Sequence, residues 1–145
     1  MVALGLVVAQ FDKEGSVVPR MEEAAREAAA DRGAEVVATL EVPGTFDTPL
    51  AADRLARRDD VDAVAVLGNV VTGDTDHDQV IGHTAGRQLS SVAVDRDTPV
   101  TFGVTGPDQS AAEAVERVEW GARAVDSAVD LVEEYDAVEE RGVYE

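Results

Sequence analysis

"VALGLVVA", residues 2–9, is a short and almost continuous run of apolar residues. A strand with one face in water alternates apolar and polar residues, whereas a strand covered on both faces is apolar along its length. Further strand-like segments occur at 34–42, 61–68 and 98–106. The sequence therefore predicts four strands, with the first one buried inside a sheet.

Helical segments separate these strands. The sequence predicts helices at 19–33, 48–60, 78–97 and 108–140. Pro19 suits a first helical turn, and Gly33 marks the end of the first helix. Thr48 is expected to cap the second helix, with Pro49 at its first position.

The later helices carry weaker signals. Gly82 and Gly86 are expected to weaken the middle of the third helix, because glycine is a poor helix former. Asp108 or Ser110 is expected to cap one long final helix. The tail at about 137–145 is expected to fray, as chain ends often do.

Strands and helices alternate four times with short connections. This alternation is typical of a parallel sheet built from right-handed crossovers. We therefore expect one domain over residues 1–145, a three-layer α/β sandwich. Its four-stranded parallel sheet, in the order 2-1-3-4, is expected to be flanked by helices.

The chain is strongly acidic, with 30 Asp and Glu residues against 12 Lys and Arg, a formal net charge of -18. Such a charge repels nucleic acid and anionic membranes, so neither is expected as a partner. The acids are spread along the chain, as in proteins of salt-loving cytoplasms. Most of them are therefore expected to lie on a hydrated surface.

Other features of composition limit the chemistry and the location. The chain has no cysteine, which excludes disulfides, thiolate catalysis and thiolate metal sites. No apolar run approaches the roughly 20 residues that cross a bilayer, and the N-terminus lacks the pattern of a signal peptide. A cytoplasmic protein is expected.

The unusual motifs all follow strands. In open parallel sheets, ligands bind beyond the carboxyl ends of the strands, near the point where the strand order reverses. Four polar segments are expected to meet at that edge: 10–15, 42–49, 68–78 and 102–110. The sequence therefore predicts a ligand site there.

The segment "TGDTDHD" (72–78) offers groups for an anion. Backbone N–H groups and a hydroxyl at Gly73, Asp74 and Thr75 can hold a phosphate ahead of a helix. The alternative is an ordinary turn with a helix cap. Because Asp74 and Asp76 repel phosphate, a basic residue from elsewhere would have to offset them.

His77 lies between two aspartates, where a carboxylate can orient an imidazole for proton transfer near neutral pH. The alternative is a solvated surface histidine. A metal site is disfavoured, because His83 lies six residues away and points to another helix face. His83 is expected to be structural.

The three phenylalanines, Phe11, Phe46 and Phe102, are all expected at the strand-end edge, where they could wall a planar ligand. Core packing is the alternative. Arg117, in the last helix, is either an ion-pair partner on an acidic surface or a bidentate phosphate clamp.

The order and spacing of "VPGTFDTPLAA" (42–52), "LGNVVTGDTDHDQV" (67–80) and "PVTFGVTGPDQSAAEAVER" (99–117) resemble the lumazine synthases of archaea. The resemblance covers almost the whole chain. It implies a flavodoxin-like fold and a cofactor-independent, metal-free condensation in riboflavin biosynthesis. That reaction joins 5-amino-6-(D-ribitylamino)uracil to 3,4-dihydroxy-2-butanone 4-phosphate, and it releases 6,7-dimethyl-8-ribityllumazine, phosphate and water.

The resemblance also implies roles for residues. Phe11 would stack on the uracil ring, and Thr45, Phe46 and Asp47 would line the ribityl pocket. The phosphate would be bound by Gly73, Asp74 and Thr75, and His77 would move protons. From an adjacent subunit, Phe102 and Arg117 would reach in, the arginine to the phosphate. Such shared sites imply a homopentamer or a shell of twelve pentamers.

Three positions depart from the family pattern: Asn69 replaces a small apolar residue beside the pyrimidine pocket, Asp12 replaces an asparagine, and Trp120 replaces a lysine. Three alternatives stay open. They are a non-catalytic flavin- or lumazine-binding or shell-forming homologue, the related archaeal riboflavin synthase, and a generic flavodoxin-like binding domain.

Overall fold

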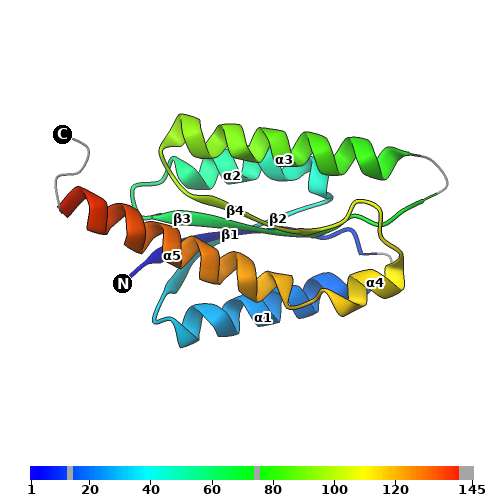
Figure 1. The fold of residues 1–145 in the computed structure, drawn as a ribbon, viewed down its shortest axis with the longest axis horizontal. Helices are drawn as coiled ribbons and strands as arrows, with labels where there is room; N and C mark the ends of the chain where they lie inside the picture. Colours follow the sequence, from blue (N-terminus) through cyan, green and yellow to red (C-terminus); the bar gives the residue numbers. More distant parts are fainter. Residues whose placement is uncertain (13–14, 74–75, 141–145) are drawn as a thin grey trace.

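The computed structural model describes residues 1–12, 15–73 and 76–140 (Figure 1). One sheet contains all four described strands, in the predicted order β2-β1-β3-β4, and every neighbouring pair is parallel. The strands are β1 (Ala3–Ala9), β2 (Glu35–Val42), β3 (Ala63–Asn69) and β4 (Val100–Thr105).

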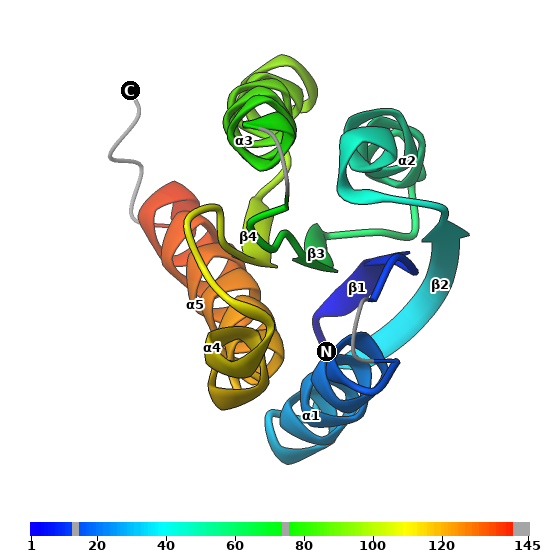
Figure 2. The ribbon, with the colours of Figure 1, turned by 90° about the vertical axis from the view of Figure 1, so that its right-hand side faces the viewer.

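Helices cover both faces of this sheet, as Figure 2 shows end-on. One face carries α1 (Val17–Asp31), α4 (Ala111–Glu116) and α5 (Trp120–Glu140). The other face carries α2 (Thr48–Ala56) and α3 (His77–Arg96), and a short 3-10 helix, η1 (Thr45–Asp47), precedes α2. The fold is the predicted three-layer α/β sandwich.

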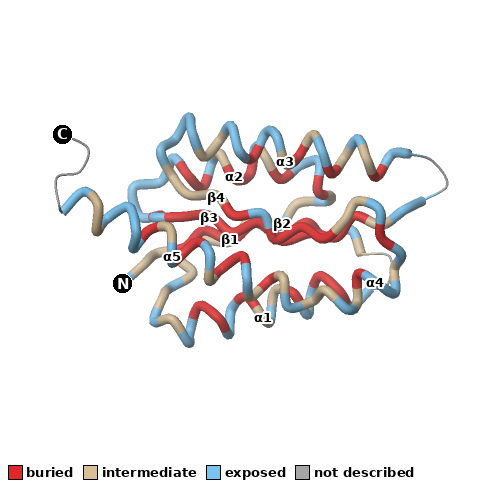
Figure 3. Tube along the Cα trace, in the orientation of Figure 1, coloured by how far each residue is buried: buried red, intermediate tan, exposed pale blue. Residues whose placement is uncertain are grey.

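The central strands β1 and β3 are buried almost throughout (Figure 3). In β3, Ala65 and Leu67 pack with α1 and α5, whereas Val64 and Val66 pack with α2 and α3. Side chains alternate between the faces of a strand, so a strand between two helical layers needs apolar residues at every position. This explains the uninterrupted apolar runs of the sequence.

Helix ends follow the predicted signals with small shifts. Gly33 has a φ of 66°, which glycine adopts without strain, and it ends α1. Helix α2 begins at Thr48, so Asp47 occupies the cap position one residue earlier than predicted. Ser110, one of the two predicted caps, accepts a hydrogen bond from the Glu113 N–H.

The single final helix predicted at 108–140 is wrong, because the chain turns between α4 and α5. Short-range bonds run through the turn, from Arg117 N to Ala114 O and from Trp120 N to Arg117 O. Beyond it, a Cβ at Gly121 would lie 2.2 Å from Met21 O, so α5 contacts the backbone of α1 directly. Tertiary packing of α5 on α1 therefore accompanies the break.

Two further expectations concerned helix continuity. Helix α3 is continuous from His77 to Arg96 despite its glycines. A Cβ at Gly82 would lie 2.8 Å from Pro107 Cδ, so this glycine permits close packing against the loop after β4. Residues 137–140, expected to belong to a frayed tail, are helical, and 141–145 lie outside the described residues. Among described helices, none combines the length and apolarity of a membrane span.

Candidate functional site

Phe11 lies directly beyond β1, at the carboxyl edge of the sheet. Its backbone N–H donates to Pro43 O at 2.9 Å, which brings it beside the loop after β2. The side chain is 60% exposed, so Phe11 does not pack in the core of the chain. Its neighbour Asp12 accepts the Val18 N–H at 2.8 Å and so pairs one of the free N–H groups in the first turn of α1.

The helix η1 is a hydrogen-bonded turn at the same edge. Thr45 is buried against β3, where a Cβ at Gly68 would lie 2.8 Å from Thr45 Oγ1. The Gly44 N–H donates to Asp47 Oδ2 at 3.0 Å. Phe46 and Asp47 are exposed beside Phe11's loop, and a carboxylate held in this way still has lone pairs for hydroxyl donors.

His77 is the first residue of α3, whose N-terminus lies at this edge, and helix α3 also contacts η1. The His77 side chain is exposed. Gly73 is exposed as well, whereas Asp74 and Thr75 of the expected phosphate segment lie outside the described residues. The described part of the chain therefore gathers Phe11, η1 and His77 at one edge.

The first turns of α3 are tied to the loop before α4. Asp78 is buried and accepts the Asp108 N–H at 3.3 Å, and the Gln79 amide donates to the Asp108 carboxylate. The Gln79 side chain also bonds His83 Nε2 at 3.0 Å. His83 is exposed, so this contact lies on the surface of α3 and His83 is not the packed or capping side chain that the sequence predicts.

All three phenylalanines were expected at the strand ends, and this expectation is wrong for Phe102. It is opposite Val66 within the edge strand β4, so it sits before the end of the strand. Its side chain is 41% exposed, and a Cβ at Gly86 of α3 would lie 3.9 Å from its Cζ. Phe102 is therefore partly exposed on the α3 side of the edge strand β4, before the strand ends where Phe11 and η1 lie.

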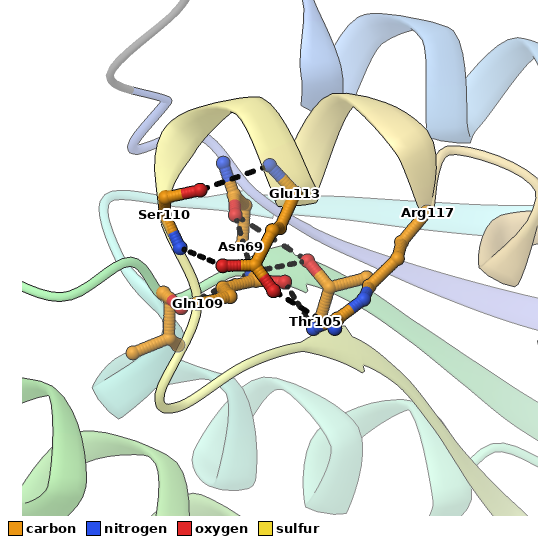
Figure 4. A network of polar contacts seen from close by, with 7 residues as sticks. Asn69, Thr105, Gln109, Ser110, Glu113 and Arg117 are labelled. Carbon is orange, nitrogen blue, oxygen red and sulfur yellow. Dashed lines mark hydrogen bonds and ion pairs between the residues drawn. The ribbon is translucent and has the colours of Figure 1, made fainter.

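Arg117 lies at the turn between α4 and α5, on the other face of the sheet from α3 (Figures 2 and 4). Its Nη1 donates to Gln109 Oε1 at 2.8 Å, and its Nη2 lies 3.5 Å from Glu113 Oε2. The guanidinium carbon lies 5.9 Å from the centre of the Trp120 ring, a cation–π distance. Trp120 is thus a platform for this arginine.

Asn69 faces away from Thr45. Gly68 turns toward η1, so the next residue along β3 points to the face of α1 and α5. There Asn69 is buried and accepts the Thr105 hydroxyl at 3.3 Å. The place of Asn69 beside a pyrimidine pocket stays a prediction. No role for Gln109 was predicted from the sequence. The alternation of side chains along β3 could have indicated that Asn69 points to the face of α1 and α5, but not which residue it meets there.

One chain thus brings together some candidates and separates others. Phe11, η1 and the start of α3 lie at the carboxyl edge. Arg117 is bound through Gln109 to the ends of β3 and β4 from the α5 face of the sheet, and Phe102 lies within the edge strand β4. Within the described ranges, no group of three or more His, Asp or Glu side chains could hold a metal ion.

An open parallel sheet with exposed aromatic and polar loops at its carboxyl edge defines an α/β protein of the small-ligand-binding class. The sequence profile of the 6,7-dimethyl-8-ribityllumazine synthase family matches residues 1–136. The chain belongs to this family, whose reaction is a step of riboflavin biosynthesis.

Individual relatives agree with the profile. A 6,7-dimethyl-8-ribityllumazine synthase of Halobacterium salinarum is 63% identical over 92% of this chain and 99% of its own. Those of Halorubrum lacusprofundi and Methanocaldococcus jannaschii are 62% and 44% identical, over 94% and 97% of this chain and 100% and 98% of theirs.

Proposed function

We propose that this chain is a lumazine synthase that condenses 5-amino-6-(D-ribitylamino)uracil with 3,4-dihydroxy-2-butanone 4-phosphate. The products are 6,7-dimethyl-8-ribityllumazine, phosphate and water. The observation that carries the proposal is the family match over residues 1–136, together with relatives of that name that align over nearly their whole length. The proposal treats residues 1–145 as one domain that needs no cofactor or metal.

The pyrimidine substrate would lie at the ends of β1 and β2. Phe11 is exposed there and can stack on the uracil ring. Thr45, Phe46 and Asp47 would line the ribityl chain, with the Asp47 carboxylate accepting its hydroxyl groups. Because hydrogen bonds fix η1 internally, these side chains would meet the substrate without reordering the backbone.

The phosphate substrate would bind where β3 leads into α3. Gly73, Asp74 and Thr75 would bind its phosphate through N–H groups and the threonine hydroxyl. His77, at the start of α3, would move protons as the imine forms, phosphate leaves and the ring closes. Each of these steps transfers a proton, which is the task that an imidazole performs near neutral pH.

Arg117 and Phe102 would act in the site of a neighbouring subunit. This arrangement is supported by the place of Arg117 on the opposite face of the sheet from η1 and α3, and by the exposure of Phe102 in the edge strand β4. The active unit would then be a cytoplasmic homo-oligomer, a pentamer or a shell of twelve pentamers. Repeated contacts of one kind close into such rings.

The test is to mix the purified protein with both substrates in molar KCl and to follow fluorescent lumazine and free phosphate. We expect both products in equal amounts at a rate above the uncatalysed condensation. Particle size is measured on the same sample. An assembled oligomer that gives no rate above background would refute the enzyme and favour a binding or shell-forming protein.

A further inference from the structure

A buried polar cluster joins the ends of β3 and β4 to Arg117 (Figure 4). At its centre is Gln109, which is 1% exposed. Its Nε2 donates toward three acceptors: Asn69 Oδ1 at 3.0 Å, Thr105 Oγ1 at 2.9 Å and Val70 O at 3.1 Å. These contacts place the whole side chain of Gln109 inside the protein.

The acceptors fix which way the Gln109 amide points. Val70 O can only accept, and the Thr105 hydroxyl already donates to Asn69 Oδ1. A flipped amide would turn its oxygen toward these acceptors and its NH₂ group toward a guanidinium. The Gln109 oxygen therefore points at Arg117, whose Nη1 donates to it at 2.8 Å.

A neutral partner leaves the charge of Arg117 available. A carboxylate at Gln109 would form an ion pair and neutralise the guanidinium, whereas an amide oxygen holds it without adding charge. The acid nearby, Glu113, lies 3.5 Å away and also accepts the Ser110 N–H, which is the main reason that the pKa of Glu113 is lowered. Arg117 is 34% exposed, so its other N–H groups can reach a ligand.

We infer that Gln109, oriented by Asn69, is the positioning residue that presents Arg117 to the substrate phosphate. The inference rests on the proposed function for the identity of that phosphate. The Trp120 ring adds a second contact to the guanidinium. Asn69 and Trp120 both depart from the family pattern, and both act on Arg117. Asn69 orients Gln109 from the interior, and the Trp120 ring contacts the guanidinium directly.

The experiment measures the Kd of inorganic phosphate by calorimetry on the assembled protein in molar KCl. Gln109→Met keeps an unbranched side chain of similar length but removes the acceptor. We expect phosphate to bind about 10-fold more weakly, the effect of losing one charge-assisted hydrogen bond of about 1.4 kcal/mol. Asn69→Ala, which releases the Gln109 amide, is expected to act in the same direction with a smaller effect.

The discriminating measurement repeats each substitution with Arg117→Met already present. A positioning residue acts through its partner, so neither substitution should then weaken phosphate binding further. In steady-state kinetics, Gln109→Met should raise the KM of the butanone phosphate and leave the KM of the uracil substrate unchanged. Additive effects, or equal changes in both KM values, would overturn the inference.

Thr101→Val is the matched control. Thr101 is also buried on β4 and donates a hydrogen bond to Ala124 O at 2.8 Å, but it has no hydrogen bond to the Gln109 cluster. This variant should lose stability without losing phosphate affinity. The phosphate titration does not depend on turnover. A protein that makes no lumazine, but whose phosphate Kd still depends on Gln109, would refute the proposed reaction and leave the positioning role of Gln109 standing. Unchanged phosphate binding in Gln109→Met and Asn69→Ala would refute the positioning role alone.

Discussion

The two histidines of the chain lie on one helix but in different surroundings. His83 is in the second turn of α3, and its Nε2 is bound to the Gln79 amide oxygen at 3.0 Å. His77 begins the helix at the carboxyl edge of the sheet, the edge that also carries Phe11 and η1. Of the two, His77 is therefore the one that lies at the edge where we propose that the substrates bind.

Alanine variants of His77 and His83 test whether the two histidines have different roles. We expect His77→Ala to lower the turnover of lumazine formation by about 10-fold to 100-fold. This is at or below the lower end of the roughly 100-fold to 10,000-fold that a general acid or base usually contributes, because the uncatalysed condensation is already feasible. His83→Ala is the control and should retain turnover to within about two-fold, because its hydrogen bond lies on the α3 surface. Equal losses in both variants would contradict the proton-transfer role.

The sequence could predict which residues are exposed at the site, but it could not predict their mutual placement. Phe11, Phe46 and Asp47 follow strands directly, so the direction of a parallel sheet is enough to locate them. Gln109 has no such signal, since its role depends on a hydrogen-bonding partner in Asn69, 40 residues earlier. Phe102 was placed too close to the strand end, because register is set by pairing with β3.

At the scale of elements, the order of strands was predictable and the break between α4 and α5 was not. Buried apolar runs that alternate with helical segments permit few topologies. The stretch after Ser110 is rich in helix-forming residues, so local propensity favours one continuous helix. The break accompanies the approach of Gly121 to Met21 O, a contact between segments far apart in the chain.

That approach leads to a prediction about Gly121. A Cβ at this position would lie 2.2 Å from Met21 O, so Gly121→Ala must push α5 away from α1. We expect the free energy of unfolding to fall by about 1–3 kcal/mol, the usual cost of overpacking. Urea unfolding in molar KCl measures the change.

Gly86→Ala is the matched control on another helix. A Cβ there would meet only Phe102 Cζ, at the ordinary contact distance of 3.9 Å. Alanine should then stabilise the interior of α3 by about 0.5–1 kcal/mol through its better helix propensity. Equal destabilisation of both variants would show that helix packing is not the cause of the Gly121 effect.

Over the whole molecule, two of the few basic side chains join helices by ion pairs. Arg32, on α1's C-cap, bonds Asp130 of α5 at 2.6 Å and also reaches Asp126. Arg96 at the end of α3 bonds Asp53 of α2 at 2.7 Å, and this hydrogen bond is the main reason that the pKa of Asp53 is lowered. These pairs neutralise some acids locally, but 30 acidic residues cannot be matched by 12 basic ones.

The unmatched acids predict how stability depends on salt. With a net charge of -18, the folded chain concentrates repulsion that the unfolded chain relieves by expanding. The screening length falls from about 10 Å at 0.1 M to about 3 Å at 1 M salt, so the repulsion fades while contacts such as Arg32–Asp130 persist. We expect the thermal midpoint to rise by at least about 4 °C between 0.1 M and 2 M KCl, which corresponds to about 1 kcal/mol for a chain of this length.

Sucrose provides the control for that salt effect, because it favours compact states by exclusion from the protein surface without screening charge. If repulsion between the acidic side chains limits stability, sucrose added at 0.1 M KCl should raise the thermal midpoint of unfolding. The midpoint should still rise when KCl is then added. If exclusion is the cause, the dependence on KCl should persist at pH 4.2, the pI of the chain, where the net charge vanishes. Screening instead requires that dependence to be weakest near pH 4.2 and to return below it, because the 12 basic residues and the histidines then leave a positive net charge. A midpoint that is equal at 0.1 M and 2 M KCl, at unchanged particle size, would show that the acidic surface does not limit the stability of this protein.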